Sequence, residues 1–123
     1  MKPIRVLLAD DASAYRTLLR VALEEDGRFA VVGEASDGAE AVQLSSDKRP
    51  DVLLLDLAMP VMDGLQAIPE VRSRSPQTKI VVLSGFSRGR LGEEVVSVGA
   101  SAYLEKGEAL ETIADALVEL GKS

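Results

Sequence analysis

The feature of this 123-residue sequence that most constrains its fold is a regular alternation of short apolar runs and segments of helical periodicity. The apolar runs have the length of strands, and we expect strands at residues 4–9, 28–36, 52–55, 79–84 and 101–105. Each run is followed by a segment that favours a helix, at residues 13–26, 38–46, within 64–74, at about 89–98 and at about 108–120. Strands that are almost continuously apolar are typical of a parallel sheet with helices on both faces. The pattern therefore predicts an α/β fold, a five-stranded doubly wound parallel sheet flanked by five helices.

Length and charge limit what such a domain does. We expect one domain at residues 1–123, since this length is that of a single domain. The 14 Lys and Arg residues against 20 Asp and Glu residues give a net charge of −6, which argues against direct binding to nucleic acid or an anionic membrane. No apolar run is long enough to span a bilayer, and Asp10 and Asp11 interrupt the N-terminal segment before a signal-peptide core could form. We therefore expect a cytoplasmic protein.

The sequence contains neither cysteine nor histidine. The first absence excludes disulfides, a thiolate nucleophile and a cysteine-based zinc site. The second excludes a Ser-His-Asp triad, a histidine general base and a histidine-ligated metal. Any chemistry must therefore come from carboxylates, lysine or arginine, hydroxyls, backbone groups and a hard cation.

Polar side chains follow four of the five predicted strands. The first strand ends at Asp10 and Asp11, the third at Asp56, the fourth at Ser84 and the fifth at Lys106. Taken alone, each of these residues is more often a helix cap, a turn residue or a solvated surface charge. Carboxyl ends of parallel strands share one edge of the sheet, however, and ligand sites of such folds lie there. The joint placement of all five residues predicts a functional site.

The chemistry of that site follows from its three carboxylates. Two carboxylates 4 Å apart repel each other by roughly 4 kcal/mol at an effective dielectric constant near 20, so either their pKa values rise or a cation lies among them. An all-oxygen ligand set without histidine or cysteine favours Mg²⁺. A carboxylate beside that ion, such as Asp56, could act as a nucleophile toward a phosphoryl group. Lys106 and the Ser84 hydroxyl would then contact the phosphoryl oxygens.

The segments "VLLADD", "LLLDLAMPVMDG", "VVLSG" and "AYLEKG" together resemble the receiver domains of bacterial two-component response regulators. The resemblance covers essentially the whole chain, is closest to receivers of the LuxR/NarL type, and implies the flavodoxin-like, CheY-like fold. It implies that Asp56 is the phosphoacceptor and that Lys106 contacts the phosphoryl group. It also implies a Mg²⁺ site and a conformational switch. The residues for the metal are Asp11 directly, Asp10 through water, Asp56 and the Ala58 carbonyl, and those for the switch are Ser84 and Tyr103.

The resemblance also implies partners. A sensor histidine kinase must supply the phosphoryl group, because this chain has no histidine of its own. Small donors such as acetyl phosphate are a further source. Phosphorylation is expected to repack the surface formed by the fourth helix, fifth strand and fifth helix, with homodimerisation as one outcome. The receiver would then control a DNA-binding output domain that this chain does not contain, and it is expected to be no enzyme beyond gaining and losing its own phosphoryl group.

Other interpretations compete with this one. A phosphatase of the haloacid dehalogenase type needs a second acid two residues after the nucleophile, where this chain has Ala58. A flavin-binding protein of the same fold would need a glycine-rich phosphate loop and more aromatic residues than the 3% present here. Two alternatives stay open, a stand-alone receiver that acts by protein contact and a receiver-like interaction module that is never phosphorylated.

Three positions depart from the usual receiver pattern. Gly107 stands where receivers often have a proline with a cis bond, so a cis peptide is not expected. Gly89 and Gly92 weaken the start of the fourth helix, because each glycine costs about 1 kcal/mol relative to alanine. We expect that helix to be short, to begin near Glu93, or to be mobile. Pro69 lies within the third helix, which should start late or kink.

Overall fold

The computed structural model describes residues 2–121 of the chain. In these residues the strands are β1 (Ile4–Ala9), β2 (Phe29–Ala35), β3 (Val52–Leu55), β4 (Lys79–Ser84) and β5 (Ala102–Glu105). The helices are α1 (Ser13–Asp26), α2 (Gly38–Lys48), α3 (Gly64–Arg74), α4 (Gly89–Ser97) and α5 (Leu110–Gly121). Strands and helices alternate in the predicted order, and each predicted strand is confirmed to within one residue at either end.

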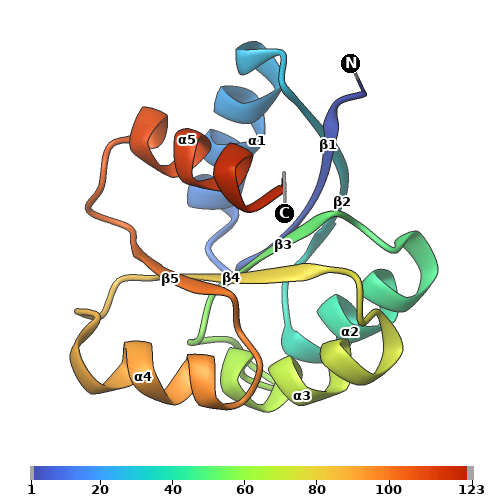
Figure 1. Ribbon diagram of the computed structural model, residues 1–123, viewed down its shortest axis with the longest axis vertical. Coiled ribbons are helices and arrows are strands. Elements are labelled where there is room, and N and C mark those ends of the chain that lie inside the picture. The colour runs from blue at the N-terminus through green and yellow to red at the C-terminus, as the bar shows by residue number, and fades with distance from the viewer. Residues whose placement is uncertain (1, 122–123) are drawn as a thin grey trace.

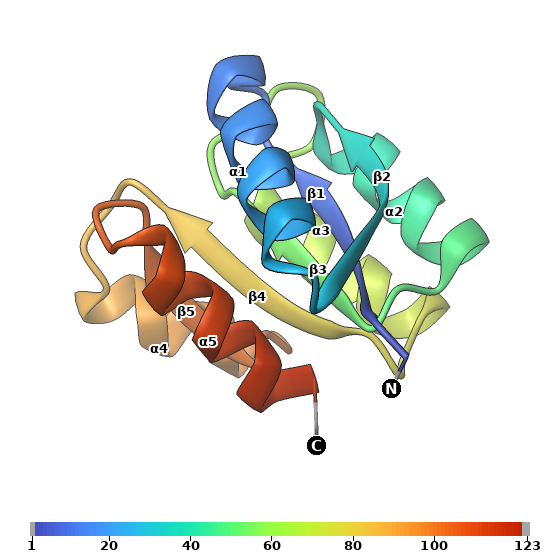
Figure 2. The ribbon, with the colours of Figure 1, turned by 90° about the horizontal axis from the view of Figure 1, so that it is seen from above.

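The five strands form one parallel sheet in the order β2-β1-β3-β4-β5. Helices α1 and α5 cover one face of this sheet, and α2, α3 and α4 cover the other (Figure 1, and from above in Figure 2). The doubly wound α/β fold is therefore confirmed. The strand order changes direction between β1 and β3, and in such sheets the crevice at that switch point is where ligands bind.

The two faces of the sheet carry separate hydrophobic cores, which explains why the central strands are almost continuously apolar. All four side chains of β3 are buried, but they alternate in direction. Leu53 and Leu55 pack into the core under α2, α3 and α4, and Val52 and Leu54 pack into the core under α1 and α5. Full burial of one such side chain contributes about 1.5–3 kcal/mol. The central strands are thus fixed from both sides, and so are the residues that follow them.

Helix ends agree with the local sequence. Gly27 ends α1 in the left-handed conformation, with φ of 84°, as expected of a C-terminal glycine. The Asp63 side chain accepts a hydrogen bond from the Gln66 backbone, and the Gln66 side chain accepts one from Asp63, which forms a capping box at the start of α3. This helix starts at Gly64, so the late start expected from Pro69 is wrong. The capping box stabilises the first turn, and the proline removes a single backbone donor further along.

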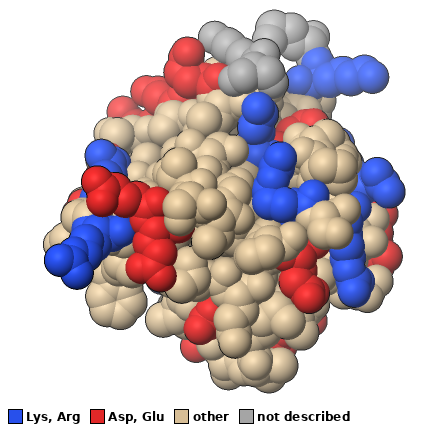
Figure 3. Space-filling view, turned by 60° about the horizontal axis from the view of Figure 1, so that its bottom comes forward, with Lys and Arg blue, Asp and Glu red and all other residues tan. Residues whose placement is uncertain are grey.

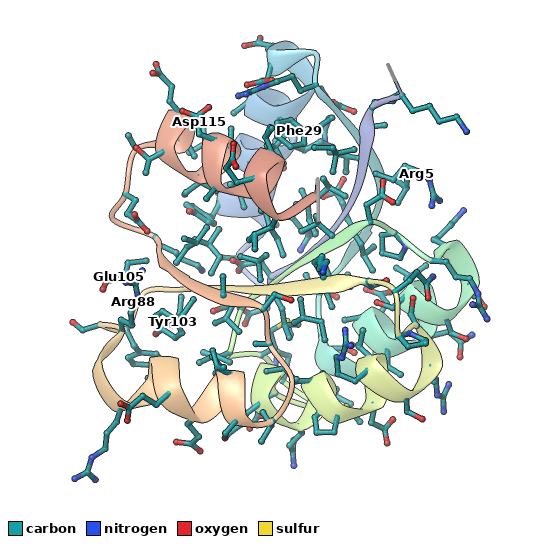
Figure 4. All side chains as sticks on the ribbon, in the orientation of Figure 1. Arg5, Phe29, Arg88, Tyr103, Glu105 and Asp115 are labelled. Carbon is teal, nitrogen blue, oxygen red and sulfur yellow. The ribbon has the colours of Figure 1, made fainter. Side chains whose placement is uncertain are left out.

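The start of α4 also corrects the sequence-based expectation. The helix is short, at nine residues, but it begins at Gly89 and not near Glu93. A Cβ atom on Gly92 would lie 2.5 Å from Cγ of Arg88, so this glycine leaves room for the arginine side chain. The Arg88 guanidinium donates a 2.9 Å hydrogen bond to the Tyr103 carbonyl, and the two residues lie together between α4 and β5 (Figure 4). This contact holds the first turn of α4 against the sheet and offsets the low helix propensity of glycine.

Two further expectations concern the backbone and the surface. The peptide bonds of the described residues are all trans, including the one before Gly107. No helix in residues 2–121 combines the length and the apolar content that crossing a membrane requires. Side chains of both charge signs border a broad uncharged strip on the face shown in Figure 3, so the net charge of −6 does not produce a continuous acidic surface there.

Candidate phosphorylation and metal site

Three carboxylates meet at the carboxyl ends of β1 and β3. One oxygen each of Asp10, Asp11 and Asp56 lies within 4.8 Å of the others. The register of the two strands causes this, because Ala9 pairs with Leu55 and the Asp56 amide donates a 2.9 Å hydrogen bond to the Ala9 carbonyl. Asp10 and Asp56 are buried, at 4% and 6% exposure, whereas Asp11 is exposed. The structure thus brings together the three acids that the sequence predicted as a group.

Lys106 reaches this group from the end of β5. Its ammonium nitrogen lies 2.7 Å from Oδ2 of Asp10 and 3.5 Å from Oδ2 of Asp56. Its backbone amide donates a hydrogen bond to the Ser84 carbonyl, which fixes the lysine beside the end of β4. Partial burial lowers the pKa of Lys106, but the hydrogen bond with Asp10 and the negative charges of Asp56 and Asp10 outweigh it and leave the pKa above its usual value. The lysine therefore stays charged between the two buried carboxylates.

The Asp56 carboxyl is the electrostatically strained member of the group. Burial raises its pKa above the usual value and the neighbouring Asp10 carboxylate raises it further, while Lys106 and the Ala58 amide oppose this only in part. One ammonium therefore does not offset the charge of the buried acids. A bound cation would offset it. The ligands present are all oxygens, which suits a hard ion such as Mg²⁺.

The raised pKa of Asp56 predicts how the stability of Asp56→Asn depends on pH. Since folding disfavours ionised Asp56, its charge costs stability at neutral pH, and this cost disappears as the pH falls through the pKa of the folded protein. Asparagine removes the cost, so the variant should be more stable than the wild type at about pH 7 and lose that advantage on acidification toward about pH 4. Urea denaturation in metal-free buffer measures the difference. A variant that is less stable at neutral pH and gains on acidification would contradict the prediction.

Ser84, at the end of β4, and Tyr103, on β5, lie beside the β4–α4 connection at the edge of the site. The Ser84 hydroxyl is buried and accepts a hydrogen bond from the Phe86 amide at 3.1 Å. The Tyr103 hydroxyl donates to the Phe86 carbonyl at 2.8 Å, and the tyrosine is only 4% exposed. Both side chains are therefore tied to the same backbone residue. In this conformation the Tyr103 ring is buried, with its hydroxyl held by the backbone of the β4–α4 connection.

Ala58 lies next to the acidic group, and its amide is 3.5 Å from Oδ1 of Asp56. Its carbonyl as a metal ligand stays a prediction. A further neighbour of the site, Tyr15 of α1, was not predicted from the sequence; its ring centroid is 4.7 Å from the Lys106 ammonium nitrogen. Tyr15 fits the apolar period of its helix, so that pattern gives it a core position. Only its hydroxyl, a polar group on an apolar face, could have drawn attention to it.

Comparison with known proteins gives a consistent result. Residues 6–118 match the response regulator receiver domain. The chain superimposes with a TM-score of 0.95 and 34% identity on the signal receiver domain assigned to the response regulator NarL of Mycobacterium tuberculosis, covering 100% of this chain and 99% of the other.

Two curated relatives differ in length. The transcriptional regulatory protein LiaR of Bacillus subtilis is 41% identical over 93% of this chain but only 54% of its own length. The chemotaxis protein CheY of Listeria monocytogenes is 30% identical over 97% of this chain and 99% of its own length. The chain thus spans about half the length of LiaR and of several other transcriptional regulators, but nearly all of CheY. On the match over residues 6–118 and these similarities, the chain belongs to the family of response regulator receiver domains.

Proposed function

We propose that this receiver domain works as a phosphorylation switch, with Asp56 as the phosphoacceptor. The observation that carries the proposal is the position of Asp56. The residue lies at the carboxyl end of a strand buried on both faces, and the Lys106 ammonium pairs with both Asp56 and Asp10. The raised pKa of Asp56 indicates a carboxylate that is poorly compensated in the unmodified site. Transfer of a phosphoryl group and binding of a divalent cation would each change the net charge around Asp56.

In the proposed step an Asp56 carboxylate oxygen attacks the phosphorus atom and forms a new P–O bond. The bond between phosphorus and the donor breaks, and its electron pair leaves with the donor, which is the imidazole of a sensor histidine kinase or the acetate of acetyl phosphate. Lys106, 3.5 Å from Asp56, compensates charge on the transferred group. When bound by Asp10, Asp11, Asp56 and the Ala58 carbonyl, Mg²⁺ would supply further charge compensation for the phosphoryl oxygens.

The switch would start at Ser84. To donate a hydrogen bond to a phosphoryl oxygen, its hydroxyl has to give up or share the contact with the Phe86 amide. The Tyr103 hydroxyl donates a hydrogen bond to the carbonyl of the same Phe86, so a shift of Phe86 would move Tyr103 and with it β5. Arg88 at the start of α4 bonds the Tyr103 carbonyl, so the shift would also reach α4. The surface of α4, β5 and α5 would then change. Tyr103 is already buried, so phosphorylation would shift a population between existing states.

The output of the switch is a separate part of the proposal. About half the length of LiaR lies outside the region matched by this chain, and LiaR is a transcriptional regulatory protein. This supports a receiver that controls a DNA-binding output domain, with dimerisation on phosphorylation as one route. The near-complete match to CheY favours the second candidate, a receiver that acts alone through protein contact. The length of the open reading frame distinguishes the two.

The proposal is tested by incubating the protein with acetyl phosphate and Mg²⁺ and measuring its intact mass. We expect the mass of one added phosphoryl group, and no addition when a chelator removes Mg²⁺. Peptide mapping after borohydride reduction should place the group on Asp56. A protein that gains no mass with either acetyl phosphate or a panel of phosphorylated histidine kinases would instead be a receiver-like interaction module.

Lys106→Ala should separate labelling from switching. Asp56 and the carboxylate group remain, so the variant should still acquire some phosphoryl group, but more slowly. A direct link between the phosphorylated site and β5, beside the route through Ser84, is lost with the lysine, so the α4 and β5 surface of the phosphorylated variant should change less than that of the wild type. Hydrogen exchange of residues 86–105, with and without phosphorylation, measures this. Exchange changes equal to those of the wild type would show that the lysine is not required for switching.

A further inference from the structure

A tyrosine of α1 lies against the site that the proposed function uses. The Lys106 ammonium nitrogen is 4.7 Å from the centroid of the Tyr15 ring, within the range of a cation–π interaction. The same ammonium contacts Asp10 at 2.7 Å and Asp56 at 3.5 Å. Lys106 is therefore held by two carboxylates and one aromatic face.

The hydroxyl of Tyr15 is the second unusual feature. It is buried, and within the described structure it has no hydrogen-bond partner. Burial raises the pKa of Tyr15 above its usual value; Lys106 opposes this, and the charges of Asp10 and Asp56 add to it. The hydroxyl is thus protonated at neutral pH and is an available donor near three charged groups of the site.

Packing alone does not account for a tyrosine here. A buried polar group without a partner costs free energy, and leucine, methionine or phenylalanine would fill an apolar helix face without that cost. A buried polar group that lacks a hydrogen-bond partner in one functional state often has one in another state. For Tyr15 the state that would supply an acceptor is the phosphorylated one, in which the phosphoryl oxygens lie beside Lys106.

We propose that Tyr15 is a positioning residue of the phosphorylation site, whose ring holds the Lys106 ammonium and whose hydroxyl donates a hydrogen bond when phosphoryl oxygens are present. The inference rests on the proposed function and adds a residue to it. The two parts of the side chain act at different stages. The ring orders the lysine before phosphoryl transfer, and the hydroxyl stabilises the product.

The role of the ring is tested with Tyr15→Leu, which keeps an apolar side chain. Loss of a partly desolvated cation–π contact should lower the second-order rate constant for labelling by acetyl phosphate on the order of tenfold. The decisive measurement is the same substitution in a Lys106→Ala background, where it should have no further effect. A loss of similar size in both backgrounds would show that Tyr15 serves only helix packing and would overturn the role of the ring.

The role of the hydroxyl is tested with Tyr15→Phe, which keeps the ring. The labelling rate should stay within about twofold of the wild type and the thermal midpoint of the unphosphorylated protein should be equal or higher, whereas the aspartyl phosphate should lose lifetime several-fold. Val118→Ala, which alters the same core from α5, is the packing control and should leave the lifetime unchanged. An unchanged lifetime in Tyr15→Phe would overturn the role of the hydroxyl.

Failure of the proposed function gives a different result. If the wild type itself is never labelled, Asp56 phosphorylation is wrong and the hydroxyl loses its acceptor. The ring can still be judged without phosphorylation, because Tyr15→Leu should then lower the thermal midpoint more in the wild type than in Lys106→Ala. Equal shifts in the two backgrounds would also reject the contact between ring and lysine as a functional one.

Discussion

Asp56→Asn is expected to abolish stable phosphorylation, the largest effect of any single substitution in this chain. An amide has no anionic oxygen to attack phosphorus, while its size and shape keep the buried position filled. The variant should therefore fold and show no gain of one phosphoryl group by intact mass with acetyl phosphate and Mg²⁺. Asparagine also removes one negative charge from the buried acids, so the variant should be at least as stable as the wild type. If it is, unfolding does not explain the loss of labelling.

A matched control lies at the other end of the same strand. Asp51 is exposed just before β3, and its carboxylate accepts a 2.8 Å hydrogen bond from the Arg5 amide. Asp51→Asn makes the same chemical change, retains an acceptor oxygen, and should be labelled as the wild type is. If Asp56→Asn is labelled to the same extent as Asp51→Asn, another carboxylate accepts the phosphoryl group, and Asp10 and Asp11 become the candidates.

The strands and the acidic group were predictable from sequence because a single physical constraint determines both. A strand buried on both faces has to be apolar at every position, as β3 is from Val52 to Leu55. The first polar residue after such a strand must then lie at the edge of the sheet. Asp56, directly after β3, and Ser84, the last residue of β4, were found in this way, without knowledge of the strand order. Parallel pairing of neighbouring strands is what brings the residues at that edge together.

The error at the start of α3 has a local cause, the Asp63–Gln66 capping box, but the other two concern residues whose role depends on a partner distant in sequence. Gly92 has low helix propensity, but its missing Cβ makes room for Arg88, whose guanidinium reaches the carbonyl of Tyr103 on β5. Propensity describes the isolated helix and contains nothing about that contact. Tyr15 fits the helical period as a core residue, and only the folded chain shows the Lys106 ammonium over its ring. The roles of Gly92 and Tyr15 therefore depend on tertiary contacts, which local sequence patterns do not describe.

Gly64→Ala is expected to have the second largest effect, on stability and labelling together. A Cβ atom at this position would collide with the backbone carbonyl of Asp56 and would lie 2.8 Å from Cα of Leu57. Alanine is the better helix former by about 1 kcal/mol, but forcing atoms into a packed backbone costs about 1–3 kcal/mol and the backbone must move to accept it. The residue displaced is the phosphoacceptor itself. We therefore expect a net loss of up to about 2 kcal/mol in the free energy of unfolding and a labelling rate reduced at least tenfold.

Two other glycines separate these effects. A Cβ on Gly38 would collide with Met62, to which its three nearest atoms belong, whereas a Cβ on Gly85 would meet nothing within 4 Å. Gly38→Ala should thus lose stability as Gly64→Ala does but keep most of its labelling rate under conditions where it is folded, and Gly85→Ala should lose little stability. Urea denaturation and intact-mass labelling of the three variants give both quantities. If Gly38→Ala and Gly64→Ala lose labelling equally at equal stability, the close approach of Gly64 to Asp56 has no role beyond folding.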